Sequence, residues 1–304
     1  MNQLIVIIGP TATGKSQLAL KLAQRFSAAI VSADSRQVYR LMDIGTAKPS
    51  PEELSLVSHH LIDIINPDED FSLARYQKMT YQKIADIQQR GKLPFLVGGR
   101  GLYVWAVVEG WQIPEVAPDL EFRQRLKGRA AQGEADELYR ELARIAPDAA
   151  GKIDSRNVRR VIRALEVAQS GTARPQLKKV APTFQTLIIG LTAERKELYR
   201  RIDQRVDEMI GQGLVDEVKS LLDKGYTLDL PSMSGIGYKQ ICLYLSGELT
   251  MEAAIQQIKT ETHRLVRRQY NWFRLKDERI KWFDITDEKI EPETETLVAR
   301  FISS

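Results

Sequence analysis

A short apolar segment, followed by a glycine-rich loop and the start of a helix, constrains this chain most. Residues 4–8 read Leu-Ile-Val-Ile-Ile, the β-branched composition of a strand that is buried on both faces. Apolar residues recur at helical spacing further on, so we expect a helix to begin near residue 15. Between them lies a complete G-x-x-x-x-G-K-S sequence, formed by Gly9, Pro10, Thr11, Ala12, Thr13, Gly14, Lys15 and Ser16. This context favours a phosphate-binding loop over a glycine turn that only connects two elements.

The residues of this loop suit phosphate oxygens. Gly9 and Gly14 let the backbone curl so that N–H groups point at an anion, and the helix N-terminus adds a partial positive charge. Lys15 supplies a full charge, and the Ser16 hydroxyl is suited to a Mg²⁺ ion bound between phosphate oxygens. The sequence therefore predicts a phosphorylated ligand, with Mg²⁺ as cofactor.

Composition narrows the class of protein. The 304 residues are 43% hydrophobic and 28% charged, as in globular proteins, and no stretch approaches the roughly 20 apolar residues that cross a bilayer. The first residues lack the features of a signal peptide, and the single cysteine, Cys242, fits a reducing compartment. Three histidines and one cysteine disfavour a protein-ligated zinc site. We expect a cytoplasmic monomer with no membrane partner.

Alternating strand and helix patterns predict an α/β fold. Helical patterns, such as residues 73–89, separate apolar segments at residues 4–8, 28–31, 93–97, 186–191 and 280–283. This alternation predicts a parallel sheet of the phosphate-loop NTPase type, covered by helices. Because ligands bind at the carboxyl ends of such strands, residues 9–16, 34–37 and 98–101 should converge on one site.

Residues 114–187 are expected to form a helical insertion in a core made of residues 1–113 and 188–304. Pro114 and Pro118 mark a break, and a stretch with glycine and proline at 170–175 leads back to the core. Expected helices lie at 120–132, 135–145 and 155–169 in the insertion, and at 195–212, 214–224, 234–246 and 251–276 in a helix-rich C-terminal part. Residues 115–187 carry 14 basic and 10 acidic side chains, which is typical of a polyanion-binding surface and equally of a solvated helical one.

Several sequence blocks resemble one enzyme family. They lie at residues 9–16, 34–39, 43–49, 59–64 and 98–103, in the order found in the tRNA dimethylallyltransferases, also called isopentenyl-tRNA transferases. The similarity continues through residues 163–166, 201–213, 234–239 and 267–274, so it covers nearly the whole chain. With no zinc-finger extension, the chain is similar to the bacterial form.

The resemblance implies transfer of a dimethylallyl group from dimethylallyl diphosphate to N6 of a tRNA adenosine, the one immediately 3′ of the anticodon. The products would be N6-isopentenyladenosine and diphosphate. The phosphate loop with Mg²⁺ would then stabilise charge that develops on the leaving diphosphate. A carboxylate would accept the proton of the weakly nucleophilic amino group.

The resemblance also implies roles for single residues. Asp34 matches the catalytic base, although a helix cap or a metal anchor stays open on the residues alone, and Gln37 matches a position facing adenine. Thr11 and Lys15 match diphosphate contacts. Arg205 matches a catalytic position near the diphosphate, whereas the sequence alone favours an exposed charge pairing on its helix. Arg100 stands where the family usually has threonine, and it could either supply charge to the diphosphate or narrow the channel.

An adenosine in an anticodon loop must leave its stack and enter a pocket of the enzyme before it can react, so we expect residues around the pocket to contact the RNA. The resemblance implies tRNA binding by Asp34, Ser35, Arg36, Gln37, Leu102, Arg123, Arg125, Arg159, Arg160, Val161, Ile162, Arg163, Ser234, Gly235, Ile236, Gly237, Tyr238, Lys239, Arg267, Arg268, Gln269, Tyr270, Asn271, Trp272, Phe273 and Arg274. Without the resemblance, the arginines at 159–163 would be a solvated face, and Trp272 and Phe273 would be core residues.

Without the resemblance, the residues are compatible with three other functions. They are a phosphate-loop kinase or NTPase, an enzyme that prenylates free AMP, ADP or ATP, and a non-catalytic RNA-binding module. The arginine clusters at 159–163 and 267–274 favour tRNA over a free nucleotide. A complete phosphate loop together with Asp34 favours an enzyme over a binding module.

Overall fold

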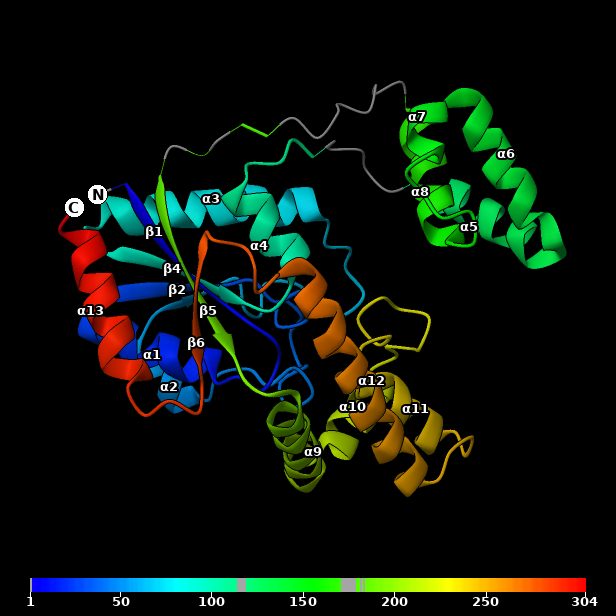
Figure 1. Cartoon of the computed structure of the whole chain (residues 1–304). Coiled ribbons are helices and arrows are strands. Elements are labelled where there is room, and N and C mark those ends of the chain that lie inside the picture. The colour runs from blue at the N-terminus through cyan, green and yellow to red at the C-terminus, as the bar shows by residue number, and fades with distance from the viewer. Residues whose placement is uncertain (1, 114–118, 171–178, 181, 183) are drawn as a thin grey trace. The chain divides into compact units, whose positions relative to one another are not determined.

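The computed structural model describes residues 2–113, 119–170, 179–180, 182 and 184–304 (Figure 1). The chain forms two compact units, one of Met1–Val108 with Pro182–Ser304 and one of Glu109–Ala181. The second unit ends before residue 187 because Gln185–Thr192 is a strand in the sheet of the first unit. The expected break at Pro114 and Pro118, and residues 171–175 of the expected return, lie outside the described residues.

The larger unit is built on a six-stranded sheet. Its strands are β1 (Gln3–Ile8), β2 (Ala28–Ser32), β3 (His59–His60), β4 (Leu93–Gly98), β5 (Gln185–Thr192) and β6 (Ile280–Asp284). They lie in the order β3-β2-β4-β1-β5-β6, and each neighbouring pair is parallel. Every residue of β1 and β4 is buried, which explains their continuous apolar sequence. The predicted α/β fold is confirmed.

Helices cover both faces of this sheet (Figure 1). On one face lie α1 (Lys15–Arg25), α13 (Ile290–Ile302) and the short α2 (Pro51–Leu56), and Leu22 and Val298 share one core with the strands. On the other lie α3 (Leu73–Gln89) and α4 (Gly101–Val108). The start of α1 and both ends of α3 agree with the sequence prediction. Helix α4 is apolar on nearly all sides, so it has no helical periodicity to reveal it.

The C-terminal helices form a group with a core of their own. They are α9 (Arg195–Gly211), α10 (Leu214–Asp223), α11 (Tyr238–Leu245) and α12 (Met251–Trp272). Helix α11 starts four residues later than predicted because Gly237 has a φ of 94°, outside the helical range. Helix α12 ends before residue 276 because Phe273 leaves the helical conformation, with φ −109° and ψ 82°.

The smaller unit is helical. It contains α5 (Leu120–Arg129), α6 (Ala135–Ile145), α7 (Pro147–Ala150) and α8 (Val158–Gln169), with a core that includes Phe122, Leu142 and Leu165. Gly133, with a φ of 95°, kinks the chain between α5 and α6. The Asn157 side chain caps α8 by accepting a hydrogen bond from the Arg160 N–H. In neither unit does a described helix have the length and apolar character needed to span a bilayer.

Candidate active site

The phosphate loop joins β1 to α1 and is closed on itself by hydrogen bonds. A Cβ at Gly9, whose φ is 146°, would lie 2.4 Å from the Leu191 carbonyl oxygen, so only glycine fits against β5. The Lys15 ammonium donates to the Pro10 carbonyl at 2.5 Å, and the Thr13 hydroxyl donates to the same oxygen at 2.9 Å. The Lys15 side chain therefore folds back over the phosphate loop, where it is expected to bind phosphate oxygens.

Three charged side chains from separate elements act on one another beside this loop. Burial and the nearby Arg205 guanidinium lower the pKa of Lys15 to about 7, and Asp34 opposes that shift. Burial also lowers the pKa of Arg205, while Asp34 and Glu208 raise it. Lys15 comes from α1, Arg205 from α9 and Asp34 from the loop after β2. Two partly desolvated cations beside one carboxylate form a site suited to a polyanion.

The loop after β2 holds Asp34 and Gln37 in place. Asp34 Oδ1 accepts a hydrogen bond from the Arg36 N–H at 2.7 Å, whereas Oδ2 has no hydrogen bond within the described part of the chain. Gln37 Oε1 accepts from the Ser32 hydroxyl at 2.9 Å, and its Nε2 donates to the Ala47 carbonyl at 3.1 Å. Nε2 also donates to the Thr46 carbonyl at 3.4 Å, so both donor positions have partners and Oε1 keeps one further acceptor position for a ligand.

Two tyrosines that the sequence analysis did not select lie near Asp34. Tyr103 of α4 stacks on Tyr76 of α3, with ring centroids 4.0 Å apart, and Tyr76 donates to the Ser32 carbonyl at 3.3 Å. Burial raises the pKa of Tyr103 to about 12, Arg100 opposes this, and Asp34 adds to it. Tyr103 is the last residue of the family block at 98–103, and this was the sequence signal that could have identified it as a site residue.

Five residues expected at the tRNA surface are instead in the interior. Val161, Ile162, Tyr238, Gln269 and Phe273 are at most 7% exposed. The first two lie in the core of the smaller unit, Tyr238 lies in the core of the C-terminal helices, and Phe273 packs against Trp105. These five side chains are therefore left out of the tRNA contacts proposed below, because a helix in a block of polar and aromatic residues still turns part of its surface inward.

The arginines of the smaller unit divide into two kinds. Arg123 donates to both carboxylate oxygens of Glu166 at 3.0 Å, and Arg163 donates to the same carboxylate. Although burial opposes it, these bonds lower the pKa of Glu166. Arg159 and Arg160 face solvent. The arginine cluster at 159–163 therefore presents two exposed cations, whereas Arg123 and Arg163 stabilise the fold of the smaller unit through Glu166.

The remaining expected tRNA residues lie at least partly on the surface, apart from the buried glycines 235 and 237. Exposed are Arg125, Ser234, Lys239, Arg267, Arg268, Asn271, Trp272 and Arg274, and partly exposed are Ser35, Arg36, Leu102, Ile236 and Tyr270. Arg36 donates to the carbonyls of Pro231 and Ser232, so it ties the Asp34 loop to the loop before α11. The Arg125 guanidinium lies 5.3 Å from the centre of the Phe122 ring.

Arg100 is exposed at the start of α4, and its side chain has no hydrogen bond or ion pair with any described residue. Burial lowers the pKa of the Arg36 guanidinium, and the charge of Arg100 acts in the same direction. The guanidinium of Arg100 therefore stands beside another cation and has no carboxylate partner among those residues.

The structure is compatible with Mg²⁺ at Ser16. Within the described residues, no three His, Cys, Asp or Glu side chains are grouped to hold a metal ion. Ser16 is exposed in the first turn of α1. A metal here would need phosphate oxygens and water as its other ligands, and Mg²⁺ characteristically accepts such a set.

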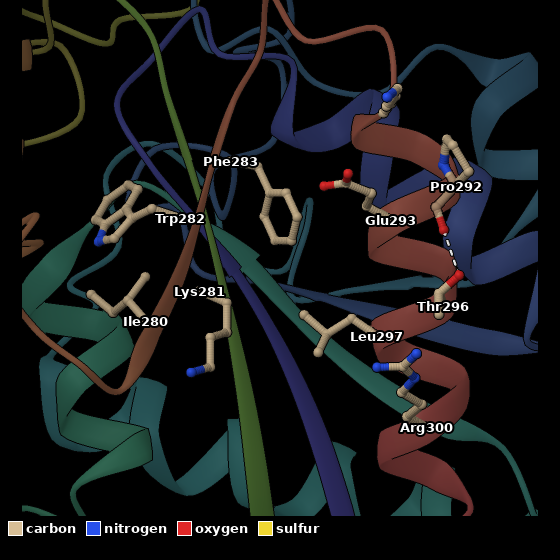
Figure 2. A pocket seen from close by; sticks show the side chains of 10 residues that line it. Ile280, Lys281, Trp282, Phe283, Pro292, Glu293, Thr296, Leu297 and Arg300 are labelled. Atoms are coloured by element: carbon tan, nitrogen blue, oxygen red, sulfur yellow. Dashed lines mark hydrogen bonds between the residues drawn. The ribbon is translucent and has the colours of Figure 1, made fainter.

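A separate pocket of about 810 Å³ lies between β6 and α13 (Figure 2). Apolar Trp282, Phe283 and Leu297 line it together with Lys281 and Arg300. It shares no residue with the Asp34 site.

Comparison with known proteins decides the family. The IPP transferase profile matches residues 37–276, and the isopentenyl transferase profile matches residues 2–67. The chain belongs to the IPP transferase family. The tRNA dimethylallyltransferase of Roseiflexus sp. strain RS-1 is 53% identical to this enzyme over 277 residues, which are 90% of each chain. That of Dehalococcoides mccartyi is 50% identical over 276 residues, 90% of this chain and 85% of its own.

Solved structures agree with this assignment. The tRNA isopentenylpyrophosphate transferase of Bacillus halodurans matches with a TM-score of 0.73 and 42% identity, over 98% of this chain and 96% of its own. A eukaryotic dimethylallyltransferase acting on tRNA matches with a TM-score of 0.83 and 26% identity, over 100% of this chain and 80% of its own. The family and the prenyltransferase class predicted from the sequence blocks are confirmed.

Proposed function

We propose that this enzyme transfers a dimethylallyl group from dimethylallyl diphosphate to N6 of the adenosine immediately 3′ of the anticodon in tRNA. The products are N6-isopentenyladenosine and diphosphate. The observation that carries the proposal is the convergence of Lys15, Arg205 and Asp34, because it puts cations for a diphosphate beside a carboxylate for a proton.

The reaction exchanges one bond for another. The adenine N6 lone pair forms a bond to C1 of the dimethylallyl group, and the C1–O bond breaks with its electron pair passing to the diphosphate. Lys15 and Arg205 bind the leaving group, where negative charge increases, so they stabilise the transition state more than the ground state. The Ser16 hydroxyl would hold Mg²⁺, which would supply further positive charge to that group when bound.

Asp34 accepts the proton that N6 loses, through the oxygen that has no described hydrogen bond. Gln37 accepts a hydrogen bond from the adenine edge at the Oε1 position that Ser32 leaves open. The Ser32 hydroxyl also accepts a hydrogen bond from the Asp34 N–H at 3.3 Å. The same hydroxyl therefore helps to position both Asp34, the proposed proton acceptor, and the Gln37 amide that faces adenine.

The tRNA contacts are proposed for exposed side chains only. On the smaller unit these are Arg125, Arg159 and Arg160, and on the larger unit they are Arg267, Arg268, Asn271, Trp272, Arg274, Ser234 and Lys239. The arginines suit phosphates, and Trp272 offers a ring on which an unpaired base can stack. We expect the enzyme to act as a monomer in the cytoplasm, where its tRNA substrate is.

The decisive experiment incubates the protein with labelled dimethylallyl diphosphate, Mg²⁺ and unmodified tRNA, followed by nucleoside mapping. Label is expected at one adenosine, and a tRNA with guanosine at that position should accept none. Transfer to free AMP, ADP or ATP, or hydrolysis of ATP without transfer, would replace the proposal with one of the alternative functions.

A further inference from the structure

A buried amide on α12 connects two loops of the active site. Gln269 Oε1 accepts a hydrogen bond from the Thr11 N–H at 3.0 Å, and Gln269 Nε2 donates to the Gly99 carbonyl at 2.9 Å. Thr11 belongs to the phosphate loop after β1, and Gly99 follows β4. Gln269 is 7% exposed, so its amide is largely shielded from solvent, and it makes one bond to each loop.

The loop after β4 is shaped to receive α12. A Cβ at Gly99 would lie 2.4 Å from Gln269 Nε2, and one at Gly101 would lie 2.3 Å from the Trp272 Cβ. Gln269 and Trp272 are three residues apart and therefore share one face of the helix. Two glycines thus permit the close approach that brings the amide within reach of the phosphate loop.

The bond to Thr11 acts on Lys15 through a single peptide unit. The Thr11 N–H and the Pro10 carbonyl belong to the same planar peptide, so fixing one fixes the direction of the other. That carbonyl accepts from the Lys15 ammonium at 2.5 Å and from the Thr13 hydroxyl at 2.9 Å. Rotation of the peptide would move the acceptor away from Lys15.

We propose that Gln269 is a positioning residue for diphosphate binding, which orients the Pro10–Thr11 peptide and thereby places the Lys15 ammonium. It acts through Lys15 and does not touch the substrate. The inference rests on one part of the proposed function, which is that the phosphate loop binds a diphosphate. Because Gln269 stands between exposed arginines and Trp272 on α12, it also links the proposed tRNA-binding helix to the leaving-group site.

The test measures the affinity of the full-length protein for inorganic diphosphate with Mg²⁺ by calorimetry. Gln269→Met keeps the size and flexibility of the side chain but removes both hydrogen bonds. We expect diphosphate to bind about tenfold more weakly, the effect of losing one well-placed hydrogen bond. Gln257→Met, on an exposed face of α12, is the matched control and should bind as the unmodified protein does.

A double-mutant cycle separates positioning from a general structural role. In a Lys15→Ala background, Gln269→Met should weaken diphosphate binding no further, because the group it places is gone. Equal losses in both backgrounds, or unchanged affinity in Gln269→Met, would overturn the proposal. If Gln269→Met does not fold, Gly99→Ala displaces the same amide from the other side and is put through the same cycle. Diphosphate binding needs neither tRNA nor turnover, so this outcome is independent of the transfer assay.

Discussion

The Tyr238 hydroxyl donates a hydrogen bond to Glu217 at 2.5 Å, in a site where the same carboxylate meets three consecutive backbone N–H groups. These are the N–H groups of residues 43, 44 and 45, at 2.8, 2.7 and 3.1 Å from the Glu217 oxygens. The loop they begin continues to the Ala47 carbonyl, which accepts from Gln37. Helices α10 and α11 therefore support the amide proposed to face adenine.

Glu217→Ala should lower the free energy of unfolding by about 2 kcal/mol, because the buried Tyr238 hydroxyl and three less buried backbone N–H groups lose a charged acceptor. Tyr238→Phe removes one of these bonds and should cost about 1 kcal/mol. Urea denaturation of both variants measures the two values. Equal stability of Glu217→Ala and the unmodified protein would show that water replaces the carboxylate.

Diphosphate binding should take up protons at alkaline pH. The pKa of Lys15 is about 7 in the free protein, so at pH 8 most of the side chain is neutral. A bound diphosphate favours the ammonium and raises this pKa, so binding takes up about one proton at pH 8. Affinity should then fall as pH rises above 7, by at most about tenfold per unit, until the pKa of the complex is passed.

Calorimetry in buffers of different ionisation enthalpy counts these protons. Lys15→Arg keeps a permanent charge and should abolish the uptake. Uptake that persists in this variant would assign the proton to another group.

Asp34→Asn should reduce the single-turnover transfer rate by ~10²–10⁴, because an amide cannot accept the N6 proton. Affinity for tRNA should change little, since the carboxylate acts on a proton and not on the RNA backbone. Rapid-quench kinetics and a binding titration on the same variant check both parts. Lost binding with a surviving rate would make Asp34 an RNA anchor.

Arg160→Ala and Arg268→Ala should each weaken tRNA binding and reduce the slope of log affinity against log salt by about one. Transfer at saturating tRNA should be nearly unchanged. Arg123→Ala is the contrasting variant, because this arginine is bound to Glu166, and it should destabilise the smaller unit more than it changes the slope. An unaltered slope would show that Arg160 or Arg268 is a solvated surface residue that does not contact phosphate.

Arg100→Thr should raise the transfer rate. Arg100 has no carboxylate partner among the described residues and acts on Arg36 as a like charge, so a threonine hydroxyl in its place would remove this repulsion. Rate and dimethylallyl diphosphate affinity are measured side by side for both proteins. A slower and weaker-binding Arg100→Thr would identify the guanidinium as a diphosphate ligand.

Features that depend on neighbouring residues could be read from the sequence. The start of α1 at Lys15 and the bounds of α3 follow from the local spacing of apolar residues, and the strands from short apolar runs. The family followed from ordered blocks, which also identified Asp34 and Arg205 before their proximity was known. None of these inferences required knowledge of which distant segments meet.

Only the tertiary structure decided which face of a helix is buried and what it meets there. Gln269 lies among arginines and aromatics in the sequence, but its partners are 258 and 170 residues away, so its burial has no local signature. Glu217 likewise looks like a helix surface charge until residues 43–45 are brought to it. Periodicity tells that a helix has an inner face, whereas packing between distant segments determines which polar groups that face encloses.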